Sequence, residues 1–286
     1  MSVHQKCKFV AEVSSNHHQD IERCYEFIEA SARIGCDAVK FQLFKIDKLF
    51  APEILSKSKT HRSRKQWELP ESYIPLLSAH CKKHGIEFSC TPFYLEAVEV
   101  LAPHVDFFKI ASYELLWDDL LIACAKTGLP VVISVGMATE LEVKHAVAVL
   151  KSQGCTPTVL HCVSSYPTPH NECNLATIGY LGKLLDCPTG WSDHSRSPAV
   201  IRRAITHWQS SFIEFHIDLD GEGGEYAAGH CWLPEEMQPL IEEFSKIREI
   251  DGEPGIYISP SEDPDKLWRA DPSDGLRPFK EIRSKF

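Results

Sequence analysis

One strand–helix–strand unit can be read directly from residues Phe9–Gln42, which run FVAEVSSNHHQDIERCYEFIEASARIGCDAVKFQ. Two short apolar runs, Phe9–Ser14 and Asp37–Gln42, flank the amphipathic stretch Ile21–Ile34. Gly35 follows that stretch, and glycine is the residue that most often ends a helix. A buried strand, a helix and a second buried strand in this order predict two parallel neighbours in one sheet.

The same alternation continues along the chain and predicts the fold class. Further strand-like runs are Glu87–Pro92, Phe107–Ser112, Pro130–Gly136, Pro157–Ser164, Cys187–His194 and Ser211–Asp218. Eight strands that alternate with helices over about 220 residues indicate an α/β protein with a single-domain (β/α)8 TIM barrel, and a doubly wound parallel sheet is the alternative. We assign the barrel to residues 1–250. Residues 251–286 are rich in Pro, Gly and Asp, and we expect a short C-terminal tail packed on the barrel.

Composition and charge exclude several classes of protein. The 286 residues carry a net charge of −10, which argues against nucleic acid or an anionic membrane as a partner. No apolar run approaches the roughly 20 residues that span a bilayer, and the N-terminus lacks the apolar core of a signal peptide, so we expect a cytoplasmic protein. The 11 cysteines form no CxxC pair, which predicts reduced, small hydrophobic side chains rather than structural zinc ligands.

Polar side chains stand at the C-terminal ends of most predicted strands, where the active sites of such barrels form. Lys40 and Lys109 each end a strand. Hydroxyl groups stand at comparable depth on other strands, at Thr91, Ser112, Ser134, Ser164 and Ser192. Two cations and a set of hydroxyl donors predict a site for phosphate or carboxylate. A Schiff-base role for either lysine is the alternative.

A second candidate site lies where the last strands end. His194 and His216 end two strands that are neighbours in the barrel, beside Asp193 and Glu214. Together with Glu12 from the adjoining first strand, the two histidines are candidate ligands for Mn²⁺, Fe²⁺, Co²⁺ or Zn²⁺. A hydrogen-bonded structural role for the histidines is the alternative.

Eight segments at these strand ends resemble the sialic acid (N-acetylneuraminate) synthase family. They are AEVSSNH (11–17), DAVKFQ (37–42), CTPF (90–93), FKIAS (108–112), ISVGM (133–137), LHCVSSYPTP (160–169), GWSDH (190–194) and IEFH (213–216). The resemblance covers roughly residues 9–245. It is specific because the segments occur in order and each lies at a strand end.

The resemblance implies a metal-dependent enzyme of surface-polysaccharide biosynthesis that condenses phosphoenolpyruvate with an aldose to a 2-keto-3-deoxy sugar acid and phosphate. It implies that His194 and His216 bind the metal, with Mn²⁺ favoured over Mg²⁺ or Co²⁺. It also places Glu12 near the metal and the sugar, and Tyr166 on the sugar side. The implied phosphoenolpyruvate positions are Lys40, Thr91, Lys109, Ser112, Ser134 and Ser192, with Ser164 where the family often has Asn. A weakly active sugar- or partner-binding barrel and a Schiff-base aldolase stay open as alternatives, and so does a homodimer.

The sequence departs from the family pattern near its end. We expect a short form without the antifreeze-like domain that follows the barrel in longer members. The loop Gly221–Pro234 lacks the usual Pro-Gly-Pro-Asp-like stretch, and Glu225 and His230 are its candidate contacts to the acceptor. This loop has carboxylates and no Lys or Arg, and carboxylates would repel a phosphate group on the acceptor. We therefore predict a non-phosphorylated aldose. The alternative phosphate clamps are Arg196, Arg269 and the basic Ser56–Lys65 loop, which is either a solvated excursion or a lid. Arg269 and Arg277 in the tail are candidates to fold over the barrel mouth in place of the arginine that the antifreeze-like domain supplies in longer members.

Overall fold

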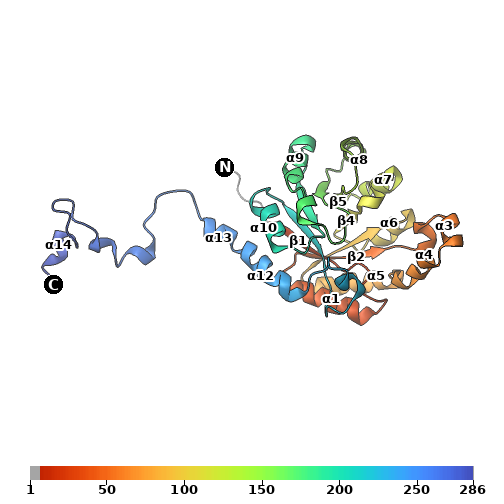
Figure 1. Ribbon diagram of the computed structural model, residues 1–286, viewed down its shortest axis with the longest axis horizontal. Coiled ribbons are helices and arrows are strands. Elements are labelled where there is room, and N and C mark those ends of the chain that lie inside the picture. The colour runs from red at the N-terminus through yellow and green to blue at the C-terminus, as the bar shows by residue number, and fades with distance from the viewer. Residues whose placement is uncertain (1–6, 286) are drawn as a thin grey trace. The chain divides into compact units, whose positions relative to one another are not determined.

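The computed structural model describes residues 7–285, and it confirms the (β/α)8 barrel (Figure 1). Eight parallel strands form a closed barrel in chain order, and β1 pairs with β8 to close it. The strands are β1 Lys8–Glu12, β2 Ala38–Leu43, β3 Glu87–Pro92, β4 Phe107–Ile110, β5 Val131–Ser134, β6 Thr158–His161, β7 Thr189–Asp193 and β8 Phe212–His216. Several of the predicted runs continue past these ends into the loops that carry the polar side chains.

Helices surround the barrel and begin at residues that favour helix starts. They include α1 Ile21–Arg33, α5 Ile74–His84, α6 Leu95–Leu101, α7 Asp118–Lys126, α8 Glu140–Ser152, α9 Ala176–Leu185, α10 Pro198–Thr206 and α12 Pro234–Ser245. The Asp20 side chain accepts a hydrogen bond from the Glu22 amide at the start of α1, and Thr139 and Glu142 form a capping box at α8. Within residues 7–285, no helix is both long and apolar enough to cross a membrane.

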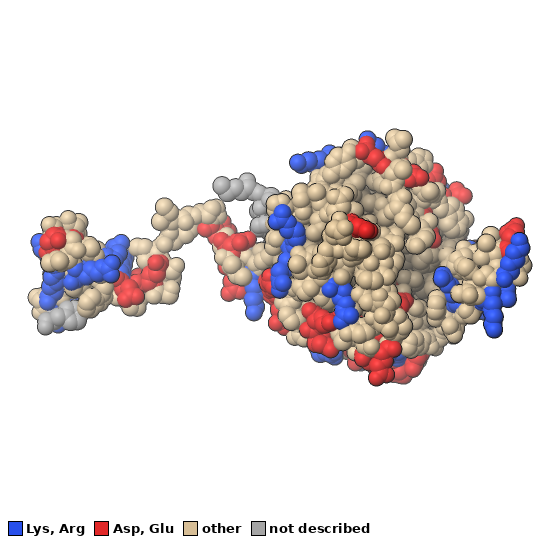
Figure 2. All heavy atoms as spheres, viewed as in Figure 1, with Lys and Arg blue, Asp and Glu red and all other residues tan. Residues whose placement is uncertain are grey.

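The basic stretch Ser56–Lys65 is helical, so its description as a loop is wrong. The segment after β2 folds into α2 Ile46–Leu49, α3 Pro52–Lys57, α4 Lys59–Ser63 and a 3₁₀ turn at Arg64–Trp67. Local signals account for this: Pro52 occupies the first turn of α3, and the Ser58 hydroxyl caps α4. Basic side chains gather over this part of the molecule (Figure 2).

The barrel interior is layered, with apolar side chains below and polar side chains above. The lower layer is a buried cluster of Val10, Ala38, Phe107, Val132, Leu160 and Phe212. Two residues further along the same strands or just after them stand Glu12, Lys40, Lys109, Ser134, Cys162 and Glu214. Because side chains alternate along a strand, residues two apart share a face, and each apolar residue except Leu160, which lies beneath Cys162, lies beneath a polar one.

The chain divides into two compact units, which end at Lys246 and at Phe286. The second unit, Ile247–Phe286, contains α13 Ile247–Asp251 and α14 Lys280–Arg283. Within it, Arg283 donates to both carboxylate oxygens of Asp274. The packing of residues 251–286 against the barrel stays a prediction.

The lower layer leaves no room for a side chain at Gly190, so we expect Gly190→Ala to lower the free energy of unfolding by about 1–3 kcal/mol. An added Cβ would lie 2.4 Å from the Phe212 carbonyl oxygen and 2.6 Å from Leu160 Cδ2. Chemical denaturation measures the effect. Gly224→Ala is the matched control, because its Cβ would have nothing within 4 Å. Equal stability of the two variants would contradict the layered packing.

Candidate active site

A cavity of about 580 Å³ opens at the C-terminal ends of the strands. Most of the predicted site residues line it: Glu12, Lys40, Thr91, Lys109, Ser112, Ser134, Tyr166, Ser192, His194 and His216. Ser164, Glu225 and His230 are not among the lining residues. The structure therefore brings the two lysines, the hydroxyl groups and both strand-end histidines to one cavity.

Four buried charges form a connected network in the wall of this cavity. The Lys40 ammonium group forms an ion pair with the Glu12 carboxylate. Glu214 lies between the two lysines, with its carboxylate oxygens 3.3 Å from Lys109 Nζ and 3.8 Å from Lys40 Nζ. Thr91 Oγ1 accepts from Lys40 Nζ at 3.2 Å. The two positive and two negative charges compensate one another, because at this buried position water does not solvate them.

The network keeps Glu214 and Lys40 charged. Burial would raise the pKa of Glu214, but the charges of Lys109 and Lys40 lower it to about 2. Burial would lower the pKa of Lys40, yet Glu12 and Glu214 raise it above its usual value. Lys40 and Lys109 are each only 3% exposed, so neither is a solvated surface residue.

Hydroxyl groups surround the lysines, and two of the predicted ones have no hydrogen-bond partner. Ser134 Oγ and Ser164 Oγ are buried without a hydrogen bond. Ser192 Oγ donates to Glu214 at 3.0 Å, and Ser112 Oγ accepts from the Gly136 amide at 3.0 Å. Ser164 lies next to Gly136, because a Cβ added at Gly136 would stand 2.5 Å from Ser164 Oγ. An unpaired buried hydroxyl costs free energy unless a ligand satisfies it.

His194 is prepared to bind a ligand through one ring nitrogen. Its Nδ1 lies 2.7 Å from the Val163 carbonyl oxygen, so Nδ1 donates there and Nε2 keeps its lone pair. Burial and the nearby His216 lower the pKa of His194 to about 3, which keeps the ring neutral. The His194 and His216 ring centroids are 5.4 Å apart, and the Tyr166 ring packs 4.1 Å from that of His194.

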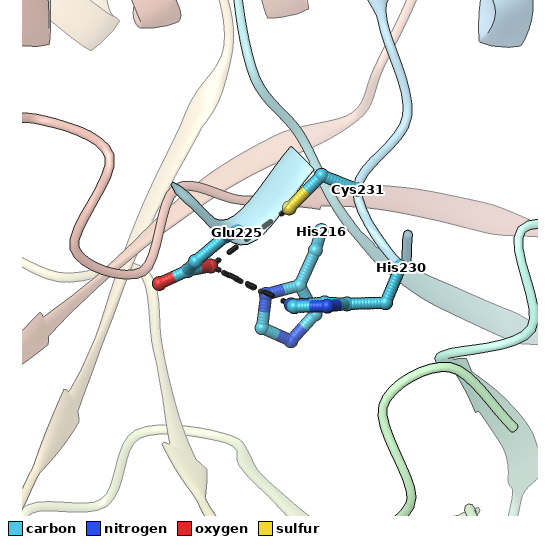
Figure 3. Close-up of side chains that lie close together, drawn as sticks. All are labelled: His216, Glu225, His230 and Cys231. Carbon is cyan, nitrogen blue, oxygen red and sulfur yellow. Dashed lines mark hydrogen bonds and ion pairs between the residues drawn. The ribbon is translucent and has the colours of Figure 1, made fainter. Parts of the chain in front are cut away.

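A second group of side chains meets around His216, and it does not include His194. Potential metal ligand atoms of His216, Glu225, His230 and Cys231 all lie within 4.8 Å of one another (Figure 3). Glu225 stands at the centre, since its Oε2 is 3.5 Å from His216 Nδ1, 3.7 Å from His230 Nε2 and 3.8 Å from Cys231 Sγ. His194 and Glu12 do not belong to this group.

The charges of this group differ from those of isolated side chains. Burial would lower the pKa of His216, but interactions with Cys231 and Glu225 raise it to about 10. Burial would raise the pKa of Cys231, but His216 and His230 lower it. In the other ten cysteines burial raises the pKa, as expected for small hydrophobic side chains. Cys231 is therefore an exception to the interpretation of the cysteines as inert.

Two charged residues near the histidines are engaged elsewhere. The fully buried Asp193 carboxylate accepts from the indole nitrogens of Trp191 at 2.9 Å and Trp232 at 3.0 Å, and from Ser195 Oγ at 2.6 Å. Arg196 forms an ion pair with Glu236 at 2.6 Å. Asp193 thus secures the loops around the site, and the Arg196 charge is already compensated.

The structure adds cavity residues that strand-end reasoning does not identify. They include Gln42, Phe93, Glu114, Arg64, Leu49 and Phe50. Burial raises the pKa of Glu114 to about 7, and its Oε2 has no hydrogen-bond partner. Arg64 reaches the cavity from the helical segment after β2, so this segment forms part of the cavity wall. Gln42 stands two residues after Lys40 on the same strand, and this spacing is the sequence signal that could have identified it.

A closed barrel with a charged cavity at its strand ends is the architecture of an α/β-barrel enzyme. Residues 27–255 match the NeuB family, and the chain belongs to that family. The N,N'-diacetyllegionaminic acid synthase of Campylobacter jejuni is 32% identical over 87% of this chain and 78% of its own. The N-acetylneuraminate-9-phosphate synthase of Drosophila melanogaster is 30% identical over 84% of this chain and 67% of its own.

A solved structure agrees with this family. The N-acetylneuraminic acid synthetase of Leptospira borgpetersenii, in complex with citrate, superposes with a TM-score of 0.80 at 28% identity. The match covers 95% of this chain and 94% of that one. Relatives of this protein are thus named as synthases of sialic-type sugars, which supports an enzyme of this family.

We expect Asp193→Asn to lower the free energy of unfolding by at least about 1.5–3 kcal/mol, the value of one charge-assisted hydrogen bond. The amide NH₂ of asparagine cannot accept from both indole groups that the carboxylate holds. Thermal or denaturant unfolding measures the loss. The exposed Asp186→Asn substitution is the control. If both variants are as stable as the parent, the carboxylate does not secure the two tryptophans.

Proposed function

We propose that this protein condenses phosphoenolpyruvate with an aldose to give a 2-keto-3-deoxy, sialic-type sugar acid and phosphate. The observation that carries the proposal is the pair of buried lysines, Lys40 and Lys109, beside the unpaired hydroxyl of Ser134. Phosphoenolpyruvate is small and carries both a carboxylate and a phosphate group. A protein of net charge −10 can hold such an anion only with cations concentrated at one place, as they are here.

The same network explains how the site tolerates its lysines without substrate. Glu214 compensates both ammonium groups. An entering phosphate or carboxylate group supplies further negative charge to Lys40 and Lys109, and Ser134 and Thr91 complete its hydrogen bonds. Charge-assisted hydrogen bonds in a buried site are the strong ones, so most of the binding energy for the anion comes from the two lysines.

The reaction needs a nucleophilic carbon, a polarised carbonyl group and a water molecule. C3 of phosphoenolpyruvate forms a bond to the aldehyde carbon, water adds to C2, and the C2–O bond breaks to release phosphate. Glu12 lines the cavity and accepts from Gln42 Nε2 at 2.6 Å, which fixes its carboxylate. We assign Glu12 to orient the water and to take up its proton.

The histidines fit a divalent metal at the sugar end of the cavity. His194 is neutral with an available Nε2, and His216 lies next to it in the cavity wall. A divalent ion, when bound, polarises the aldehyde carbonyl group of the sugar. For a site formed by these two histidines alone, the family resemblance favours Mn²⁺ over Mg²⁺ or Co²⁺. Tyr166 packs against both rings and limits access of water.

A Schiff-base aldolase is less well supported by the same geometry. Imine formation needs a neutral amine, and Lys40 is held as a cation by two carboxylates. Borohydride trapping with a keto acid would reveal covalent labelling if either lysine forms an imine.

For the acceptor we propose a non-phosphorylated aldose. Glu225 and His230 lie beside His216 but do not line the cavity, and the loop Gly221–Pro234 that carries them has no Lys or Arg to bind a second phosphate group. Names of relatives include products with and without a phosphate group, so they do not choose between the two. Arg64 is the competing candidate, because it places a cation in the cavity wall.

We expect Lys109→Ala to weaken phosphoenolpyruvate binding roughly 10- to 150-fold, the equivalent of one charge-assisted hydrogen bond, while the KM for the aldose changes little. A phosphate-release assay with phosphoenolpyruvate, a divalent ion and a panel of aldoses measures both constants. Lys183→Ala, at an exposed site on α9, is the control. An unchanged KM for phosphoenolpyruvate would remove Lys109 from the anion site, and no phosphate release with any aldose would refute the proposed reaction.

We expect a free aldose to react in preference to its terminal phosphate ester when both compete at equal concentration. The measurement is the product ratio by mass spectrometry. A clear preference for the phosphorylated sugar would contradict the proposal. In that case Arg64→Ala should abolish the preference, because Arg64 is the cation of the cavity wall that lies outside the network of Lys40 and Lys109.

A further inference from the structure

Four side chains at the end of β8 and in the loop after it are arranged as a metal site. This group differs from the pair His194 and His216 considered above. We infer that His216, Glu225, His230 and Cys231 together bind the ion, and that it is Zn²⁺, Fe²⁺ or Co²⁺ rather than Mn²⁺. Figure 3 shows these side chains converging around the Glu225 carboxylate. His230 and Cys231 are adjacent in the sequence and lie in the segment that leads into α12.

The separations between the ligand atoms suit a small divalent ion. Zinc bonds of about 2.0–2.3 Å in a tetrahedron put neighbouring ligand atoms roughly 3.3–3.8 Å apart. The distances from Glu225 Oε2 to His216 Nδ1, His230 Nε2 and Cys231 Sγ are 3.5, 3.7 and 3.8 Å. The three contacts are thus close to the edges of a coordination tetrahedron, and they are longer than strong hydrogen bonds.

The surroundings orient these ligands as outer partners do in metal sites. Glu225 Oε1 accepts from Ser14 Oγ at 2.8 Å and from Ser15 Oγ at 2.6 Å, which turns Oε2 toward the histidines. Asn16 Nδ2 donates to the Ile217 carbonyl oxygen at 2.9 Å and approaches Cys231 Sγ at 3.7 Å. One short turn after β1 therefore fixes both the carboxylate and the thiol.

The donor types select the ion. A sulfur ligand favours zinc, iron or cobalt, whereas Mn²⁺ prefers carboxylate, carbonyl and water oxygens. Zn²⁺ can expand from four to five ligands, which leaves a position for a substrate oxygen. His216 belongs both to this group and to the cavity wall, so the proposed ion site adjoins the cavity through His216.

The role of this ion as the carbonyl activator rests on the proposed function, but its binding can be measured without the reaction. The full-length protein is stripped with a chelator and titrated with Co²⁺ alone and with Zn²⁺ alone. We expect one ion per chain, a sulfur-to-cobalt charge-transfer band, and Zn²⁺ binding tighter than Mn²⁺ binding. Cys231→Ser should abolish the band, and His230→Ala should weaken Zn²⁺ binding by more than the roughly 10- to 100-fold that loss of an outer partner costs.

Cys187→Ser is the matched control, since Cys187 lies before β7 and outside the group. Circular dichroism of the metal-free proteins checks folding, and His230→Gln provides a second variant if Cys231→Ser does not fold. A cobalt band that persists in Cys231→Ser overturns the inference. Zinc affinity that is lost in His194→Ala but unchanged in Cys231→Ser and His230→Ala also overturns it. If the band behaves as expected but no aldose releases phosphate, the metal site stands and the proposed reaction fails.

Discussion

Charge compensation between Glu12, Lys40, Glu214 and Lys109 is the constraint on which the site depends. An unpaired ammonium group in the barrel interior would be strongly destabilising, and two would be worse. The structure satisfies both lysines with two carboxylates, so the barrel can close around them before any substrate arrives. The anion-binding function and the stability of the barrel thus draw on the same side chains.

The apolar layer beneath the charged network supports it. Apolar side chains two residues earlier on the strands, such as Val10 below Glu12 and Phe107 below Lys109, exclude water from the floor of the cavity. Gly190 supplies the one position where the floor needs backbone instead of a side chain. The four charged groups of the network therefore lie above this layer, where a ligand can satisfy Ser134 and where loops can add further groups such as Glu114.

Strand alternation and barrel closure explain why much of the site can be predicted from the sequence. His216 ends β8, whereas Lys109 and Lys40 stand one and three residues before the ends of β4 and β2, so the prediction that both lysines end their strands is corrected. A closed barrel still brings these positions together. The pairing of Glu214 with both lysines depends on strand register, which periodicity does not give. The group around Glu225 depends on the path of the loop after β8, which returns to pair Trp232 with Ile217. The cytoplasmic location and the homodimer stay predictions.

The hydrogen bonds from Ser14 and Ser15 to Glu225 join the first and last loops of the barrel across the β1–β8 seam. Ser14 and Glu225 are 211 residues apart in the chain, so this contact is among the costliest in loop-closure entropy. It can form only once the last strand has joined the first. Because Glu214 also lies on β8, the same strand pairing that orients Glu225 brings in the carboxylate that compensates both lysines.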